Sequence, residues 1–365
     1  MKSTGIITEY NPFHNGHIYH IQQARELTHC DVLIAVMSPN FVQRGEPAIL
    51  SKWERTAAAL HHGVDLVIEL PTVFATQSAQ QFADAGISLL NHMGINSLVF
   101  GSESNDMETL LDLASLPINI NSFKELMKQG NSYPKALSLL SKEAYPNDIL
   151  AIAYLKSLQK YPITPFSIQR TNGYNSLEMT SSISSASAIR QALFHHEDTA
   201  HTTPLTLQGF FPQLDDYYPM IRQVLMTHSA SQLQTLLLMD EGIENLLIKN
   251  AFHYPSFSGF LNASISRRYS KSRIQRILVH LLLNHPKTLN TIAVRAPRVL
   301  GFNEIGQQYL KHLSDQEIPY VTTFKHYQND LRQLEYQATA LYSLVFPEEQ
   351  QKRLLHDEVS QLIRI

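Results

Sequence analysis

Cysteine is almost absent from this sequence. Cys30 is the single cysteine among 365 residues, so the chain can form neither an internal disulfide nor a Cys-rich zinc site, and a reducing compartment is expected. Apolar runs such as residues 277–283 are far shorter than the roughly 18 residues that suggest a membrane span. The N-terminus lacks the basic and long apolar regions of a signal peptide. We therefore expect a cytoplasmic protein without membrane association, and nothing here implies an obligatory protein partner.

The sequence also has no excess of glycine or proline and no large excess of one charge. The chain has 14 Gly and 17 Pro, with 44% hydrophobic and 17% charged residues, which excludes collagen-like, coiled-coil and disordered classes. Its 29 Lys and Arg against 32 Asp and Glu give a formal net charge of −3, which indicates no partner by itself. Because 365 residues exceed the usual size of one compact domain, we expect two domains.

Short β-branched runs alternate with helical patterns in the first hundred residues. Ser51 and Glu54 form the ends of a capping box that starts a helix, and Gly63 is placed to end it. This alternation predicts an α/β fold with a Rossmann-like parallel sheet that binds ligands beyond the carboxyl ends of its strands. The predicted strands are residues 5–7, 32–37, 66–70 and 97–100.

The character of the sequence changes after residue 194. Residues 194–211 are rich in His, Thr, Pro and acidic residues without a clear period, which is typical of a linker. Helix-like periodicity follows, and strand patterns are weak. We therefore predict an α/β domain over residues 1–195 and a mostly α-helical domain over residues 210–365. The predicted helices of the second domain include residues 223–239, 274–283 and 330–345.

The most informative segment is the loop between the first strand and a helix predicted from about Gly16 to Leu27. A helix N-terminus after the first strand offers unpaired N–H donors to a phosphate chain. His14 and His17 are three residues apart, so both imidazoles face one side and can donate hydrogen bonds to phosphate oxygens. Two surface histidines or a metal pair are the alternatives, but no third zinc ligand lies nearby. We predict no protein metal site.

This loop resembles the first motif of the HIGH-type nucleotidyltransferase superfamily, which has the form Asn-Pro-Phe-His-x-Gly-His. The superfamily's second motif, a Ser/Thr-rich turn followed by Ile-Arg, matches ISSASAIR at residues 183–190. Hydroxyls of Ser185 and Ser187, with the Arg190 guanidinium, would form a second phosphate clamp. A Ser-rich helix start is otherwise often a cap. The two motifs in this order are far more specific than either alone.

Further segments resemble one family of that superfamily, the bacterial tRNA(Met) cytidine acetate ligases. The resemblance implies an enzyme that activates acetate with ATP to acetyl-adenylate and transfers the acetyl group to the wobble cytidine of elongator tRNA(Met), giving N4-acetylcytidine. The segments are EYNPFHNGHIYH at 9–20, NFVQRGEP at 40–47, DLVIELP at 65–71, FGSE at 100–103, RRY at 267–269, RI at 273–274 and VLGFN at 299–303.

The resemblance also implies which residues contact ATP. It gives catalytic roles on the phosphates to His14 and His17, and assigns Ser187 and Arg190 to the departing pyrophosphate. Mg²⁺ is expected with ATP, held without a dedicated protein cage. The residues implied to bind ATP are Ile7, Thr8, Glu9, Tyr10, Asn11, Pro12, Phe13, His14, Asn15, Gly16, His17, Ile18, Tyr19, His20, Gly101, Asn147, Arg170, Ser187 and Arg190.

Gly101 and Asn147 also have structural interpretations, and the sequence around Asn147 and Arg170 departs from the family pattern. Asn147 lies in NDILA, where the family tends to read NNILG, and the stretch after Arg170 is a loose match. Gly101 can allow a close approach of adenine or ribose to the backbone, and Asn147 can contact the base or ribose. A plain turn glycine and a helix N-cap are the structural alternatives for these two residues.

Four polar residues follow the second strand and can face the same crevice. Arg44 is the best candidate for a substrate contact because it stands beside a glycine in a loop at the active end of the sheet. Solvated surface is favoured for Lys52 and Arg55, and Gln43 is left open. Glu9 can orient a histidine or the nucleophilic amine, although a carboxylate at a strand end is often structural.

A basic stretch is hidden in the near-neutral total. Residues 245–303 contain no Asp or Glu and nine Lys or Arg residues, which is typical of a surface that binds a phosphate backbone. A solvated helix face is the alternative, but such a face usually mixes charges. The residues predicted to bind tRNA are Arg267, Arg268, Lys271, Arg273, Arg276, Arg295 and Arg298.

Two other functions fit part of the sequence. A small-molecule adenylyltransferase of the same superfamily would use the phosphate loop, but it would need no basic helical domain. An RNA-binding protein regulated by a nucleotide would use the basic stretch, but the intact His14, His17 and Arg190 argue against it.

Overall fold

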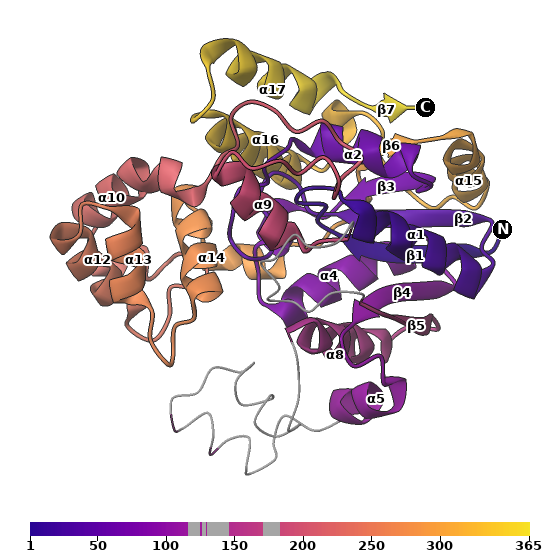
Figure 1. Cartoon of the computed structure of the whole chain (residues 1–365), viewed down its shortest axis with the longest axis horizontal. Coiled ribbons are helices and arrows are strands. Elements are labelled where there is room, and N and C mark those ends of the chain that lie inside the picture. The colour runs from indigo at the N-terminus through magenta and orange to yellow at the C-terminus, as the bar shows by residue number, and fades with distance from the viewer. Residues whose placement is uncertain (116–124, 126–128, 130–145, 171–182) are drawn as a thin grey trace.

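The computed structural model describes residues 1–115, 125, 129, 146–170 and 183–365, which form a seven-stranded sheet with helices around it and a helical lobe at one side (Figure 1). The strand order is β5-β4-β1-β2-β3-β6-β7, and the first five strands run parallel. This confirms the predicted α/β fold and all four predicted strands. The strands are β1 (Ser3–Thr8), β2 (Val32–Met37), β3 (Leu66–Glu69), β4 (Ser97–Ser102), β5 (Thr164–Gln169), β6 (Val299–Phe302) and β7 (Ile363–Arg364).

The helices between the strands follow the signals in the sequence. The Ser51 side chain accepts from the backbone N–H of Glu54, whose carboxylate accepts in return, and Gly63 follows the helix with φ at 104°. The helices up to the helical lobe are α1 (Asn15–Thr28), α2 (Lys52–His61), α3 (Thr72–Ala75), α4 (Ala79–His92), α5 (Met107–Ser115), α8 (Pro146–Leu158) and α9 (Ala186–Phe194).

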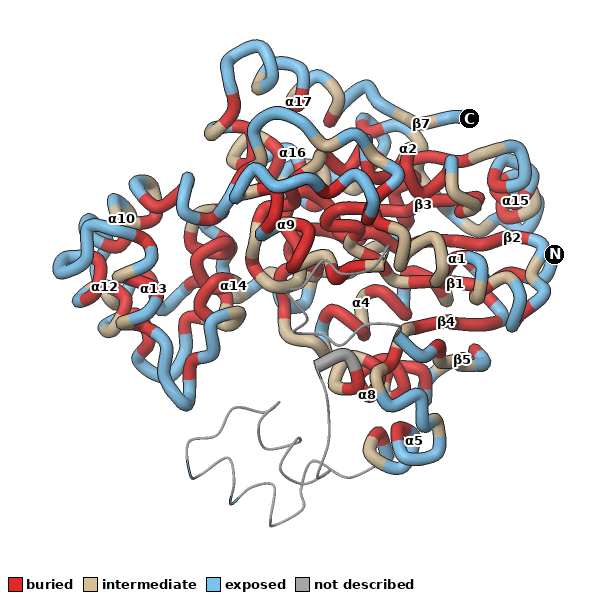
Figure 2. Tube along the Cα trace, viewed as in Figure 1, coloured by how far each residue is buried: buried red, intermediate tan, exposed pale blue. Residues whose placement is uncertain are grey.

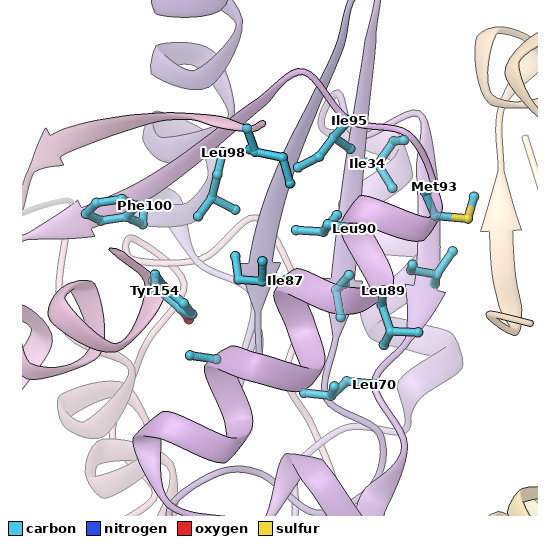
Figure 3. Packing of buried hydrophobic residues seen from close by; sticks show 14 of the residues in the cluster. Ile34, Leu70, Ile87, Leu89, Leu90, Met93, Ile95, Leu98, Phe100 and Tyr154 are labelled. Carbon is cyan, nitrogen blue, oxygen red and sulfur yellow. The ribbon is translucent and has the colours of Figure 1, made fainter. Parts of the chain in front are cut away.

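Alternating side chains of the central strands pack into two hydrophobic layers. On one face, Val32, Ile34 and Val36 belong to the cluster formed with α4 and α8. Figure 3 shows Ile34 in this cluster together with Leu90 of α4. On the other face, Leu33 and Ala35 join the cluster formed with α1 and α2. Each fully buried Val, Leu or Ile side chain stabilises the fold by about 1.5–3 kcal/mol. With both faces covered, polar side chains can gather only at the ends of the strands.

The chain beyond residue 210 is divided between a helical lobe and the sheet. The lobe lies at one side of the sheet (Figures 1 and 2). It has its own hydrophobic cluster, which also includes Phe41 from the loop after β2. The remaining part adds β6, antiparallel to β3, and β7 to the sheet. The helices of this half are η1 (Leu214–Tyr217), α10 (Tyr218–Thr227), α11 (Ala230–Leu233), α12 (Ile243–His253), α13 (Phe257–Ser264), α14 (Lys271–Leu282), η2 (Lys287–Thr291), α15 (Glu304–Asp315), η3 (Phe324–His326), α16 (Asn329–Ser343) and α17 (Glu348–Ser360).

The helix predicted over residues 223–239 is wrong in its extent. The chain breaks between α10 and α11, where Ser229 begins a new helix with a capping box to Gln232. The other two predicted helices correspond to α14 and α16. Residues 195–213 contain no helix or strand, as predicted for a linker. Among the described residues, no helix is long and apolar enough to cross a membrane.

Candidate active site

The loop after β1 is packed before it reaches α1. Tyr10 has φ at 52°, and the peptide bond between Asn11 and Pro12 is cis. The Tyr10 and Phe13 rings are buried, with their centroids 4.9 Å apart. The Asn11 side-chain oxygen accepts from the backbone N–H of Ile49 at 2.9 Å. These contacts fix the backbone that leads into the histidine pair.

The structure brings His14 and His17 together at the start of α1. Their rings stack with centroids 3.7 Å apart. Nδ1 of His14 accepts from the backbone N–H of Gly16 at 3.0 Å, and Nδ1 of His17 accepts from the backbone N–H of His14 at 3.2 Å. A backbone N–H can only donate, so both Nδ1 atoms are unprotonated and each neutral ring carries its proton on Nε2. The pair therefore presents two Nε2–H donors.

Burial and neighbouring arginines keep these imidazoles neutral. Burial, with the charges of Arg170 and Arg190, lowers the pKa of His14 to about 3. Burial, His14, His20 and Arg170 hold the pKa of His17 well below its ordinary value. Burial and Arg170 lower the pKa of His20 to about 4. A neutral imidazole still carries one N–H, which can donate a hydrogen bond to a phosphate oxygen on which negative charge develops.

The other residues of the first motif form the frame around this pair. Ile7 and Thr8 end β1, where the Thr8 hydroxyl donates to the Val36 carbonyl. Ile18 and Tyr19 lie on α1 and pack against the hydrophobic cluster.

The second motif lies beside the first. Ser185 is the N-cap of α9 and accepts from the backbone N–H of Ala188 at 3.1 Å, so the capping alternative holds for this serine. The Ser187 hydroxyl accepts from Arg44 Nη1 at 3.3 Å. Arg190 Nη1 donates to the Asn11 carbonyl at 2.8 Å. The structure thus joins Arg190 to the phosphate loop and Arg44 to Ser187.

Gly101 and Arg170 lie next to each other on β4 and at the end of β5. Gly101 stands within β4, so it is not a turn glycine, and a Cβ there would lie 3.3 Å from Cγ of Arg170. Asn147 lies within α8, and its side chain is outside the described part of the structure. The stretch after Arg170 is also outside it. Asp148 is buried and accepts from the Ser102 hydroxyl at 2.5 Å and from two backbone N–H groups. The residue that departs from the family pattern therefore orders the loop after β4.

Sequence reasoning missed a contact between the phosphate loop and residues 201–203 of the predicted linker. We call these three residues the strap. The Thr203 hydroxyl donates to the Phe13 carbonyl at 2.7 Å, and the backbone N–H of Asn15 donates to the Thr202 carbonyl at 3.0 Å. The Asn15 side chain donates to the His201 carbonyl at 3.1 Å. The backbone N–H of Asn15 is therefore committed to the protein. Threonines in an aperiodic segment give no signal for such a contact.

The structure corrects the interpretation of Lys52 and Arg55 as solvated surface. Lys52 is buried between the carboxylates of Glu69 and Glu358, which offset the cost of burying its charge. Arg55 is buried and donates to the carbonyls of Glu9, Ser38 and Pro39. It therefore ties together the loops at the carboxyl ends of β1 and β2.

Glu9 and Gln43 connect the same two loops. Glu9 Oε1 accepts from the backbone N–H of Gln43 at 2.7 Å. Burial raises the pKa of Glu9, while that hydrogen bond and the charges of Arg44 and Arg190 oppose the increase. The carboxylate is thus close to the arginines of the site as well as part of its frame.

The predicted tRNA-binding residues do not share one environment. Arg267, Arg268, Lys271 and Arg295 are exposed. Arg273 is half-buried, pairs with Glu241 at 3.2 Å and lies over the Tyr269 ring. Arg276 Nη1 faces the Gln43 carbonyl at 3.4 Å, and burial lowers its pKa to about 10.

Arg298 is not at the surface. It is 3% exposed, and Nη1 pairs with Glu69 at 3.1 Å and Glu358 at 2.5 Å. Burial acts to lower its pKa, but the two carboxylates outweigh burial and raise it. The sequence signal for Arg298 was a local excess of positive charge, whereas its partners lie far away in the chain. The Arg298 guanidinium is therefore occupied by buried carboxylates and does not face an RNA backbone.

Within the described ranges, no three His, Cys, Asp or Glu side chains gather closely enough to hold a metal ion. The side chains gathered at the site are imidazoles, guanidinium groups, hydroxyls and the Glu9 carboxylate.

Comparisons with known proteins identify the family. A model of the HIGH Nucleotidyl Transferase family matches residues 1–357. A tRNA(Met) cytidine acetate ligase of Geobacillus sp. (strain WCH70) is 37% identical, with 98% of each chain covered. One from Staphylococcus aureus (strain JH9) is 37% identical, covering 96% of this chain and 97% of that one. This chain belongs to the tRNA(Met) cytidine acetate ligase family.

Solved structures agree with that assignment. A crystal structure of Thermotoga maritima TmcAL bound with alpha-thio ATP has 30% sequence identity and a TM-score of 0.86, with both chains covered completely. Its apo form has a TM-score of 0.88 at 29% identity, again over both complete chains. The family resemblance and the fold predicted from the sequence are confirmed.

Proposed function

We propose that this protein is an ATP-dependent ligase that acetylates the wobble cytidine of elongator tRNA(Met), giving N4-acetylcytidine. The names of its relatives and the ATP analogue bound to the Thermotoga maritima protein support this activity. The observation that carries it is the stacked His14 and His17 pair, whose Nδ1 atoms accept backbone hydrogen bonds and whose Nε2–H groups remain as donors.

In the first step, an acetate oxygen attacks the α-phosphorus of ATP. An oxygen–phosphorus bond forms, the bond to the β-phosphate oxygen breaks, and its electron pair leaves with pyrophosphate. Such a transfer depends on positioning and on charge stabilisation. His14 and His17 donate to phosphate oxygens through Nε2–H as negative charge shifts toward the leaving group. Arg190 and Ser187 hold the pyrophosphate side.

Mg²⁺ accompanies ATP in this proposal. When bound with ATP, Mg²⁺ would neutralise part of the negative charge of the phosphates. Among the described residues, no three His, Cys, Asp or Glu side chains gather to hold it. The protein's own contribution is the set of neutral and cationic donors around the phosphates.

In the second step, N4 of the cytidine attacks the carbonyl carbon of acetyl-adenylate. A carbon–nitrogen bond forms, the carbon–oxygen bond breaks with its electron pair leaving on AMP, and N4 releases a proton to solvent. The tRNA is held by the basic face of the lobe. Arg267 and Arg268 are exposed between α13 and α14, and Lys271 is exposed at the start of α14. Arg273, Arg276 and Arg295, which the sequence also predicted, are the other proposed contacts of the tRNA backbone.

The first step is tested by ATP–pyrophosphate exchange with radiolabelled pyrophosphate, measured with and without acetate. We expect label to enter ATP only when acetate is present. Exchange that requires pantetheine phosphate or nicotinate mononucleotide, and not acetate, would replace this proposal with a small-molecule adenylyltransferase. Absence of exchange with any carboxylate would favour a nucleotide-regulated RNA-binding protein.

A further inference from the structure

We propose that Glu46 is a positioning residue that orients Arg190 for phosphate transfer and ties this arginine to helix α14 of the lobe. The inference rests on the proposed function, since it assigns Arg190 to the pyrophosphate side of ATP. A carboxylate repels phosphate, so Glu46 acts on the phosphates only through its cationic neighbour Arg190.

Glu46 stands in a tight hairpin that follows β2. Phe41 and Pro47 form a bridge across the hairpin base. The backbone N–H of Val42 donates to the Glu46 carbonyl at 3.0 Å, and that of Gly45 donates to the Val42 carbonyl at 2.8 Å. Phe41 is buried in the hydrophobic cluster of the lobe. The hairpin is therefore anchored at its base, and its backbone is ordered at Glu46.

The tip of the hairpin touches the backbone of α14. Gly45 has φ at +74°, and a Cβ there would lie 2.2 Å from the backbone nitrogen of Arg276. This close approach places Glu46 beside the helix, where Glu46 Oε1 accepts from Gln275 Nε2 at 3.2 Å. Helix α14 thus holds one oxygen of the carboxylate.

The other oxygen holds Arg190. Glu46 Oε2 lies 3.2 Å from Arg190 Nη2, with the two side chains 23% and 12% exposed. Arg190 Nη1 donates to the Asn11 carbonyl at 2.8 Å. One guanidinium is therefore fixed from two sides, by the phosphate loop and by the hairpin that rests on α14. Its planar shape means that two such bonds set the direction of the remaining N–H donors.

This arrangement predicts an effect on turnover rather than on ATP binding. Glu46→Ala removes the clamp and lets the guanidinium rotate, so kcat for acetate-dependent exchange falls about tenfold, the scale expected when a transition-state contact is misplaced. The same change removes a negative charge close to the triphosphate, so KM for ATP stays equal or decreases. Glu46→Gln retains an oxygen for Arg190 and a polar group for Gln275, so kcat recovers to within about threefold of the unmodified protein.

The experiment measures acetate-dependent ATP–pyrophosphate exchange for the full-length protein and for the Glu46→Ala, Glu46→Gln and Glu349→Ala variants, with thermal unfolding of each. Glu349 is an exposed glutamate in the first turn of α17, so its variant is the matched control and should exchange normally. The expected result is a low kcat with an unraised KM for Glu46→Ala alone.

Three results would overturn the inference. They are an unchanged kcat for Glu46→Ala, a raised KM for ATP with normal kcat, and equal losses in the alanine and glutamine variants, since the last would make charge rather than orientation the cause. If the unmodified protein fails to exchange, the proposed function fails instead, which separates the two outcomes.

Discussion

Replacing Arg298 with Met distinguishes a structural role from an RNA contact. In the folded protein, Lys52 and Arg298 neutralise Glu69 and Glu358, and all four side chains are at most 3% exposed. Methionine fills similar space but leaves two buried carboxylates with one cation. Breaking a buried ion pair in this way costs about 3–5 kcal/mol of unfolding free energy. Burial and Glu69 already raise the pKa of neighbouring Glu335 to about 8, so the uncompensated carboxylate meets further repulsion.

The pH dependence gives a second signature. Burial tends to raise the pKa of Glu358, but Lys52 and Arg298 outweigh it and lower the pKa. A lowered folded pKa contributes stability above the ordinary carboxyl range, and this stability is lost as pH falls through the folded value. In Arg298→Met the carboxylate can instead take a proton. The difference in stability between the two proteins should therefore shrink from pH 8 toward pH 5.

Urea unfolding followed by tryptophan fluorescence measures this effect. Trp53 is the single tryptophan, and the Arg298 guanidinium lies 5.4 Å from its ring centroid, so the probe reports directly on the network. Arg268→Ala is the control, because its exposed side chain should leave stability unchanged. A loss below about 1 kcal/mol in Arg298→Met, combined with weaker tRNA binding, would refute the structural role.

Three further changes test the site and the lobe. His17→Ala should abolish acetate-dependent exchange while tRNA affinity in a filter-binding assay stays near normal, and unchanged turnover would remove His17 from its role. Arg268→Ala combined with Arg273→Ala should weaken tRNA binding and flatten its dependence on salt; an unaltered slope would place the docking surface elsewhere. Thr203→Val should lower the exchange rate about tenfold by releasing the phosphate loop, and Thr203→Ser should restore it, whereas equal rates in all three proteins would show that the strap is dispensable.

The sequence predicted the features that depend on residues close together in the chain. β1 to β4 are short apolar runs, the Ser51 box is a contact over three residues, and the His14 and His17 pair is one helical turn. Each could be found because its partners are neighbours in the chain. The superfamily motifs then joined two segments that are far apart, which brought Arg190 to the phosphate loop.

Long-range contacts explain what the sequence did not predict. The burial of Lys52 depends on Glu69 and also on Glu358, which is 306 residues away in the chain. β6 has four residues and depends on β3 for its hydrogen bonds, so its pattern alone was too short. Thr203 reaches the phosphate loop through a side chain 190 residues from its acceptor. Neither hydrophobic periodicity nor charge counting can detect contacts between residues that are so far apart in the sequence.

The most direct test of the account is to incubate the protein with ATP, Mg²⁺, labelled acetate and total bacterial tRNA, then digest the RNA and analyse its nucleosides by mass spectrometry. The account predicts labelled N4-acetylcytidine, located at the wobble position of elongator tRNA(Met). Acetyl-adenylate without modified RNA would contradict the assigned acceptor. If neither product is formed, the result contradicts the ligase activity itself.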